Sequence, residues 1–237
     1  CPLEEWLTDR MMQNIAFENN LSETAFFLSE NNKFNIRWFT PATEVDLCGH
    51  ATLATAAVIF DKFNYKHDSI LFDSKSGELI VTKKGNEFIL YLPSDKPEKA
   101  EIDPALTEAI GLAPVESFKG REDLLLLYET EDQIRELKPD FRKLEAITQR
   151  GVIVSAPGNN TDFVSRFFAP AAGIDEDPVT GSAHTTLTPY WSERLNKKEL
   201  SAIQASARGG SLSCTDKGKR TEIAGQVAFY MEGLIEV

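Results

Sequence analysis

Hydrophobic and polar positions in the first 93 residues predict one helix followed by a β-rich region. Apolar residues between Leu3 and Asn19 follow a mostly helical spacing, and the segment LSETAFFL then has the character of a strand. The segment FNIRWF (34–39) alternates as a strand does. Three further β-rich runs lie between Ser69 and Pro93 and are joined by the glycine-containing turns KSG and KGN. This part of the chain is therefore predicted to form an antiparallel meander.

A polar segment, SDKPEKAEIDP (94–104), interrupts these patterns and contains two prolines, so we expect a linker there. Beyond it the pattern predicts helices and strands in alternation. They are a short helix from Asp103 to Gly111, a strand LLLLYE, a helix through EDQIREL and FRKLEAI, the strands GVIVSAP and TDFVSRFF, and more strands from Ala202 to Val237. Few helices among tight hairpins indicate an α+β fold with largely antiparallel sheets.

We divide the chain into two domains, residues 1–95 and 96–227, with a C-terminal strand near 228–237 that could return to the first. The 237 residues, 42% of them hydrophobic, are enough for such cores. A net charge of −12, with no basic cluster longer than the short KGKR at 217–220, argues against binding to nucleic acid or to an anionic membrane. Three cysteines without CxxC spacing fit a reducing compartment, so we expect a cytoplasmic protein.

An internal repeat is the most informative feature of the sequence. The segments RWFTPATEVDLCGHATLATA (37–56) and RFFAPAAGIDEDPVTGSAHTTLT (166–188) share five residues at a constant offset of 129 positions, as from Arg37 to Arg166. The offset then grows to 132, which pairs Gly49-His50-Ala51 with Gly181-Ser182-Ala183. A chance match between loops is the alternative, but duplication explains the pattern better and predicts two halves related by a pseudo-twofold axis.

Each repeat predicts a strand, a loop and a helix that opens at Gly-His-Ala or Gly-Ser-Ala. The first helix continues as ATLATAAVIF, which is apolar or small on all sides and therefore typical of a buried helix. The N–H groups at such a helix start need partners, and a substrate carboxylate would satisfy them. The alternative is that Asp and Thr side chains of the loop cap both helices. Pro189 predicts that the second helix is kinked or shorter.

Four side chains near these segments could carry chemistry. Glu23 precedes an aromatic strand and could exchange protons there, although a lone Glu is more often a solvated or capping residue. His50 at a helix N-terminus suits a neutral imidazole, or it is a satisfied core histidine. Asp177 could cap its helix or orient a substrate amine, and Ser182 is expected to offer its backbone N–H.

Cys48 aligns with Asp177 at the offset of 129, so the repeat would place a thiol and a carboxylate in equivalent positions for two-base proton transfer. A small buried cysteine is the alternative. His67 and His184 have no metal-binding context, and phosphate loops and nucleotide fingerprints are absent from the sequence. We therefore expect no metal and no cofactor.

The ordered motifs SETAFF, RWFTPATEVDLCGHATLATA and RFFAPAAGIDEDPVTGSAHTTLTPYW resemble the PhzF-like isomerases of phenazine biosynthesis, relatives of diaminopimelate epimerase. The resemblance covers the whole chain. It implies two pseudo-symmetric domains, each a curved, mostly antiparallel sheet wrapped around a central helix, with the site in the cleft between them. The family's opening strand and Gly-Asn-Pro turn are not found ahead of Cys1, so we expect a native N-terminal segment to precede this sequence.

By the same resemblance, the catalytic set falls on Glu23, His50, Asp177 and Ser182, and the family implies a homodimer. In the phenazine enzyme this set isomerises trans-2,3-dihydro-3-hydroxyanthranilic acid without a cofactor. For this chain we expect Glu23 to move a proton between carbons of a small carboxylic or amino acid. The residues expected around that substrate are Cys48, Gly49, Ala51, Gly181 and Ala183.

Two other functions fit the sequence. One is an epimerase or racemase that uses Cys48 and Asp177 as its two bases, and the other is a non-catalytic member of the family that binds metabolites or proteins.

Overall fold

The computed structural model describes residues 1–30, 33–148 and 150–236. Its internal contacts divide the chain into two compact units: unit 1 comprises Cys1–Tyr91 and Ala224–Val237, and unit 2 comprises Leu92–Ile223. Both points of division lie a few residues from the predicted domain limits at 95 and 227. Among the described residues, no helix has the length and apolar character needed to cross a membrane.

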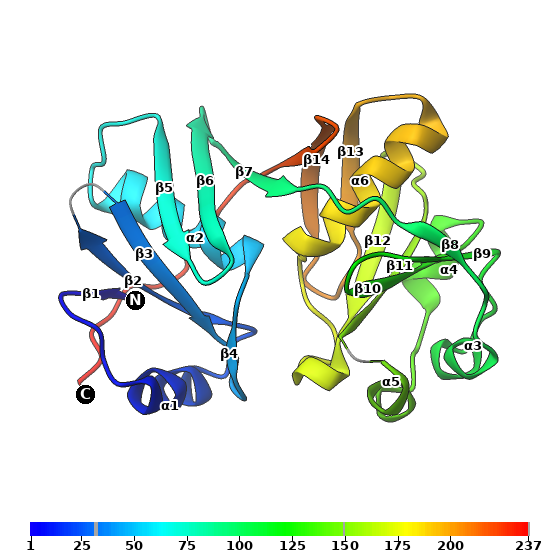
Figure 1. Cartoon of the computed structure of the whole chain (residues 1–237), viewed down its shortest axis with the longest axis horizontal. Coiled ribbons are helices and arrows are strands. Elements are labelled where there is room, and N and C mark those ends of the chain that lie inside the picture. The colour runs from blue at the N-terminus through cyan, green and yellow to red at the C-terminus, as the bar shows by residue number, and fades with distance from the viewer. Residues whose placement is uncertain (31–32, 149, 237) are drawn as a thin grey trace. The chain divides into compact units, whose positions relative to one another are not determined.

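Unit 1 contains a mixed sheet with two helices (Figure 1). Its strands are β1 (Pro2–Leu3), β2 (Thr24–Glu30), β3 (Lys33–Phe39), β4 (Glu44–Val45), β5 (Ser69–Ser74), β6 (Gly77–Lys84) and β7 (Glu87–Pro93), and its helices are α1 (Asp9–Asn19) and α2 (Gly49–Lys62). The strand order is β1-β2-β3-β5-β6-β7, with β4 attached to β3. The pairs β5–β6 and β6–β7 are antiparallel, so the predicted meander is confirmed.

The first predicted helix begins later than its hydrophobic pattern suggested. The side chain of Thr8 accepts a hydrogen bond from the backbone N–H of Met11 and caps α1, so the helix begins at Asp9. Pro2 and Leu3 instead form β1, which runs parallel to β2. The helix ends at Asn20, whose backbone is left-handed. A local capping residue thus outweighs the apolar spacing of the preceding residues.

The core of unit 1 is aromatic, and α2 is buried in it. Phe26, Trp38, Phe39 and Phe72 are almost completely buried. Helix α2 contacts β2 and β6 and is buried over most of its circumference, but Ala54 and Asp61 are exposed, so it is not buried on all sides as its apolar sequence predicts. The start of α2 is therefore held by the packing of the unit.

Unit 2 also consists of a mixed sheet with helices. Its strands are β8 (Glu98–Ala100), β9 (Glu116–Lys119), β10 (Asp123–Leu127), β11 (Gly151–Pro157), β12 (Phe163–Phe168), β13 (Glu199–Gln204), β14 (Gly210–Asp216) and β15 (Arg220–Gly225). Its helices are α3 (Pro104–Ile110), α4 (Glu131–Glu136), α5 (Phe141–Ile147), the short 3-10 helix η1 (Pro170–Ala172) and α6 (Gly181–Leu195). The strands follow the order β15-β14-β13-β12-β11-β10-β9-β8.

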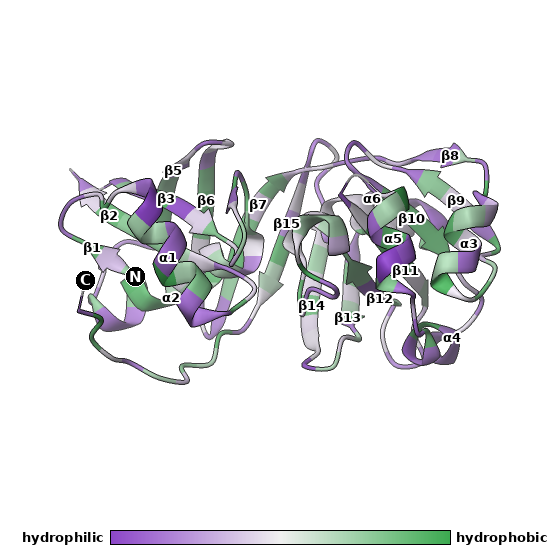
Figure 2. Cartoon of the chain, turned by 90° about the horizontal axis from the view of Figure 1, so that it is seen from below, coloured by the Kyte–Doolittle hydropathy of each residue, from purple (hydrophilic) through white to green (hydrophobic). Residues whose placement is uncertain are grey.

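Parallel pairs occur in both units, at β1–β2, β3–β5, β10–β11 and β12–β13. The antiparallel pairs are β2–β3, β3–β4, β5–β6, β6–β7, β8–β9, β9–β10, β11–β12 and β13–β14. The predicted mixture of helices with largely antiparallel strands is confirmed. Figure 2 shows β10 as mainly hydrophobic, in agreement with its four consecutive leucines. In α5 only Leu144 is buried.

Three details of the prediction for unit 2 and the C-terminus are wrong. The helix predicted through EDQIREL and FRKLEAI is two helices, because Pro139 lies between α4 and α5 and cannot continue a helix. The predicted linker contains β8, which pairs with β9. Residues 226–236 form no strand, and side chains such as Tyr230 and Leu234 are fully exposed. Val237, the end of the predicted C-terminal strand, lies outside the described residues.

Helix α6 contains Pro189 but is not shorter than α2. The alternative that the proline shortens the helix is therefore wrong. Proline has no N–H, so the carbonyl of Thr185, one helical turn earlier, loses its usual partner. The backbone N–H of Asp95 donates to that carbonyl at 3.0 Å. The hydroxyl of Thr186 also donates to the Asp95 carboxylate, at 3.0 Å. The segment after β7 thus completes the hydrogen bonding of α6.

Candidate active site

The half-site of unit 1 consists of Glu23, Cys48 and His50. The Nε2 atom of His50 lies 3.0 Å from Oε2 of Glu23, and the two side chains are 23% and 10% exposed. The Sγ atom of Cys48 lies 3.7 Å from Nδ1 of His50. Cys48 itself is buried. A carboxylate, an imidazole and a thiol, each able to hold a proton, therefore converge in a largely water-excluded place.

The local fold explains why these three residues meet. Glu23 directly precedes β2, and β2 packs against α2. Cys48 is the N-cap residue of α2, and His50 lies in its first turn. Gly49 and Ala51, predicted near the substrate, are buried in the same turn.

The protonation of His50 differs from the sequence-based expectation of a neutral imidazole. Burial lowers the pKa of His50, but the Cys48 and Glu23 side chains beside it together raise that pKa well above its usual range. Burial raises the pKa of the Cys48 thiol, an effect that His50 partly offsets. The side chains beside His50 thus favour its charged form.

The three side chains are also potential metal ligands. One ligand atom from each of Glu23, Cys48 and His50 lies within 4.8 Å of the others. The sequence-based expectation of no metal did not foresee this convergence, because the three residues lie in two separate segments. Oε2 of Glu23, which faces Nε2 of His50 at 3.0 Å, is buried and accepts no hydrogen bond that the structure describes.

The starts of α2 and α6 have in common that their N-cap side chains form no capping hydrogen bond. In this respect Cys48 and Thr180 differ from Thr8, which caps α1. The alternative that Asp and Thr side chains of the loops cap both helices is therefore wrong for these N-cap positions. An anionic group at either helix start would meet N–H donors and the positive end of the helix dipole.

In the half-site of unit 2, a buried glutamine holds the loop before α6. Gln204 on β13 accepts from the backbone N–H of Thr180 at 2.7 Å and donates to the carbonyl of Asp177 at 2.7 Å. The hydroxyl of Thr180 donates to Oδ2 of Asp177 at 2.5 Å. Asp177 is 6% exposed. The loop that carries Asp177 is thus fixed by side chains of its own unit.

The repeat is visible in the local geometry of both units. Arg37 binds Glu44 through two hydrogen bonds of 2.7 and 2.9 Å. Arg166 binds Glu176 in the same way at 2.7 and 3.0 Å. Each guanidinium also lies over a phenylalanine ring two residues further on, at 5.2 Å in unit 1 and 4.9 Å in unit 2. Such agreement supports duplication over a chance match.

The same geometry corrects one equivalence. Glu44 and Glu176 are related by the larger offset of 132, as are the N-cap residues Cys48 and Thr180. Cys48 therefore occupies the place of Thr180 and not that of Asp177. The alignment at 129 placed the extra loop residues of the second repeat too late in the sequence, which produced the wrong pairing.

Ser182 has a partner that the sequence did not indicate. An Nη2–H of Arg150 donates to Oγ of Ser182 at 3.0 Å, and Nη1 of Arg150 lies 2.5 Å from Oδ2 of Asp123. Arg150 and Asp123 belong to no motif, and only the spatial proximity of β10 and β11 brings them together. Gln204 could have been noticed as a polar residue on a buried face of a strand. The substrate-binding candidates Gly181 and Ala183 are buried beside Ser182.

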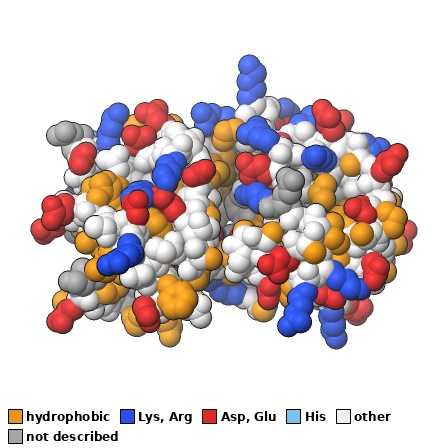
Figure 3. All heavy atoms as spheres, turned by 60° about the horizontal axis from the view of Figure 1, so that its bottom comes forward, with side chains coloured by type: hydrophobic (Ala, Val, Ile, Leu, Met, Phe, Trp, Pro, Cys, Tyr) orange, Lys and Arg blue, Asp and Glu red, His pale blue; other side chains and the backbone are white. Residues whose placement is uncertain are grey.

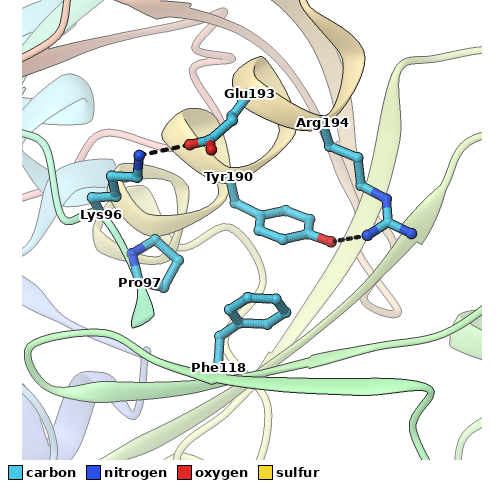
Figure 4. A pocket seen from close by; sticks show the side chains of 6 residues that line it. All are labelled: Lys96, Pro97, Phe118, Tyr190, Glu193 and Arg194. Carbon is cyan, nitrogen blue, oxygen red and sulfur yellow. Dashed lines mark hydrogen bonds and ion pairs between the residues drawn. The ribbon is translucent and has the colours of Figure 1, made fainter. Parts of the chain in front are cut away.

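The pockets described in unit 2 lie elsewhere on α6. One pocket of 290 Å³ is lined by Lys96, Pro97, Phe118, Tyr190, Glu193 and Arg194 (Figure 4). A second, of 380 Å³, shares Tyr190 and Arg194 with it. None of the candidate catalytic residues lines either pocket. On the face that Figure 3 shows, acidic and basic side chains are interspersed, so the net negative charge does not form a single patch there.

Comparison with known proteins shows which family and which solved structures this chain resembles. Residues 1–233 match the family model of the PhzC-PhzF phenazine biosynthesis-like proteins. An uncharacterised isomerase of Pseudomonas aeruginosa is 48% identical over 99% of this chain and 90% of its own length. The crystal structure of a PhzF family protein from Enterococcus faecalis is 48% identical, with a TM-score of 0.91 over 95% of this chain and 86% of that chain.

A hydroxyproline epimerase from Agrobacterium vitis, solved with bound trans-4-hydroxy-L-proline, has a similar fold. Its TM-score is 0.60 over 94% of this chain and 80% of that chain, at 9% sequence identity. This likeness concerns the fold alone.

Proposed function

Because the chain belongs to the PhzC-PhzF phenazine biosynthesis-like family and is an isomerase of that family, we propose that it moves a proton between two carbon atoms of a small carboxylic or amino acid without a cofactor. Glu23 is the acid/base of this proposal. The observation that carries it is the buried contact of 3.0 Å between Glu23 and His50. A carboxylate held there is fixed in orientation and shielded from water, as a group that removes and returns a carbon-bound proton must be.

The other residues have distinct roles in this proposal. His50 holds the Glu23 carboxylate in place through the contact of 3.0 Å between Nε2 and Oε2. The N–H groups at the starts of α2 and α6, beside Gly49 and Gly181, hold the substrate carboxylate. Asp177 orients the substrate amine, and Ser182 contributes to carboxylate binding.

We also propose that both half-sites act on one substrate, in a cleft between two pseudo-symmetric domains of the diaminopimelate-epimerase type. The support for this part is the internal repeat, which gives each unit one uncapped helix start and one Arg–Glu pair. A cytoplasmic location and a homodimer complete the proposal, on the cysteine content and the family resemblance respectively.

The experiment is deuterium incorporation from D2O, detected by NMR, into dihydro-hydroxyanthranilate and a panel of small amino and hydroxy acids. Glu23→Gln should lower the exchange rate by about 10²-fold or more, because the amide cannot accept the proton. The matched control is Glu18→Gln, an exposed glutamate of α1, which should exchange as the wild type does. Unchanged exchange in a folded Glu23→Gln variant would contradict the assignment.

A two-base epimerase or racemase that uses Cys48 and Asp177 is the second candidate. The contact of 3.7 Å between Cys48 and His50 favours it, since it places an imidazole beside the thiol with which the thiol can exchange its proton. Cys48→Ser should abolish exchange if the thiol is a base, and should leave it within a few-fold of wild type if Glu23 acts alone. Stabilisation by a metabolite with no exchange in the wild type would instead support a binding protein.

A further inference from the structure

Arg150 connects Ser182, at the start of α6, with the buried interior of unit 2. Its Nη2–H donates to the Ser182 hydroxyl at 3.0 Å. Its Nη1 lies 2.5 Å from Asp123 and 3.0 Å from Glu122. The side chain of Asp123 is 3% exposed, that of Arg150 33% and that of Glu122 58%. Asp123 is therefore the buried anchor of the group.

The sheet register explains this arrangement. Strands β10 and β11 are parallel neighbours, and Asp123 is paired with Gly151, so Asp123 and Arg150 lie at the same ends of adjacent strands. A Cβ atom on residue 151 would lie 2.2 Å from Cζ of Phe167 and 3.0 Å from Oδ1 of Asp123. Only glycine fits there, and its absence of a side chain gives the Asp123 carboxylate its room.

Burying the charged groups of this ion pair costs desolvation free energy, so the pair contributes little to the stability of the fold. Oδ1 of Asp123 is buried and has no hydrogen-bond partner among the described residues. A buried carboxylate that is only partly satisfied costs free energy, and replacing such a pair by apolar residues is often neutral or stabilising. A guanidinium close to a helix N-terminus is unfavourable as well. Stability therefore does not account for Arg150, whereas its effect on Ser182 does.

That effect follows from the hydrogen-bonding capacity of a hydroxyl, which has one donor and two acceptor sites. Arg150 occupies an acceptor site of Ser182, so the hydroxyl hydrogen is directed away from the guanidinium. Among the described residues this hydrogen has no acceptor within unit 2. Ser182 thus presents a donor next to a positive side chain and a positive helix end, which attract an anionic oxygen and repel an ammonium group.

We propose that Arg150, anchored by Asp123, is a positioning residue that fixes the Ser182 hydroxyl as a donor and makes this half-site select a carboxylate over an amide or amine. The proposal rests on the proposed function, in which this half-site binds the carboxylate end of the substrate. It assigns the specificity for that end to a residue outside the family motifs quoted above.

The test measures ligand selectivity by calorimetry, with the full chain and pairs of probes that differ only in carboxylate or primary amide, beginning with 2-aminobenzoate and 2-aminobenzamide. Wild type should bind the carboxylate at least about tenfold more tightly, and Arg150→Met should reduce that ratio below about threefold. Ser182→Ala should do the same, and the double variant should lose no more than either single one, because the two side chains act as a unit.

Two further variants separate positioning from charge. Arg150→Lys keeps the charge but cannot bond to Asp123 and Ser182 at once, so it should behave like Arg150→Met. Arg194→Met, which removes an ion-paired arginine from the far end of the same helix, should keep the wild-type ratio. Where exchange is measurable, Arg150→Met should raise KM more than it lowers kcat.

A wild-type protein without carboxylate preference overturns the proposal, as does a folded Arg150→Met or an Arg150→Lys with the full preference. These results are distinguishable from failure of the proposed function. The latter is judged by proton exchange in Glu23→Gln, whereas the selectivity is a binding measurement that needs no turnover.

Discussion

Replacing Asp123 by asparagine should change how the stability of the protein depends on pH. Burial raises the pKa of Asp123 from 3.8 to about 6, an effect that Arg150 offsets only in part. The folded state therefore binds more protons than the unfolded state between these two values. Stability contributed by the protonated group is present below pH 3.8 and is lost as the pH rises through 6.

The magnitude follows from the same linkage. The whole shift corresponds to about 3 kcal/mol, at about 1.4 kcal/mol for each pKa unit. Integration between pH 5 and pH 8 gives a loss of about 1.4 kcal/mol in the free energy of unfolding, since about half of the 3 kcal/mol is already lost below pH 5. Asp123→Asn cannot titrate, so this loss should be absent from the variant.

Urea unfolding at pH 5 and pH 8 gives the change in the free energy of unfolding between these pH values for each protein. Subtracting the change in Asp123→Asn from that in the wild type isolates Asp123, because the other titrating groups contribute to both. The matched control is Asp162→Asn. The pKa of Asp162 is lowered by Lys197 and Ser201 despite its partial burial, so this group stays ionised across the range. Equal pH slopes for wild type and Asp123→Asn would refute the reasoning that burial dominates at Asp123.

Two other predictions concern the cysteine thiols and the buried glutamine Gln204. In the native protein iodoacetamide should modify Cys1 alone, because Cys48 and Cys214 are buried and burial raises the pKa of both thiols, that of Cys214 to about 12. Mass spectrometry checks this, and modification of Cys48 at the rate of Cys1 would contradict it. Gln204→Ala should lower the free energy of unfolding by about 2–4 kcal/mol, because it removes the hydrogen bonds to the buried N–H of Thr180 and the buried carbonyl of Asp177. Chemical denaturation measures the loss, and Gln133→Ala, in an exposed capping box, should cost no more than about 1 kcal/mol.

The sequence predicted those parts of the structure that depend on local pattern. The alternation of apolar and polar residues predicted the strands of the meander, and the continuous apolar character of 51–60 predicted the burial of α2. The repeat gave the correspondence between Gly49 and Gly181, because both begin a helix. Pattern failed at Asp9 and at Pro139, where one capping residue or one proline overrides the spacing of its neighbours.

The half-sites were predicted less completely, for a physical reason. Glu23, Cys48 and His50 were each selected from their own surroundings, but their convergence depends on the packing of β2 against α2. The raised pKa of His50 follows from that convergence and could not be foreseen from the helix N-terminus alone. Arg150 and Asp123 carry no local signal at all, since their contact depends on the pairing of β10 with β11.

Pro189 makes the formation of α6 a long-range event. The helix cannot complete its middle turn from its own backbone, and the missing donor comes from Asp95, which lies 91 positions from Thr186 in the chain. Closing a loop of that length costs chain entropy before the hydrogen bond forms. Helix α6 and the segment after β7 should therefore protect each other's amide hydrogens from exchange as one cooperative unit.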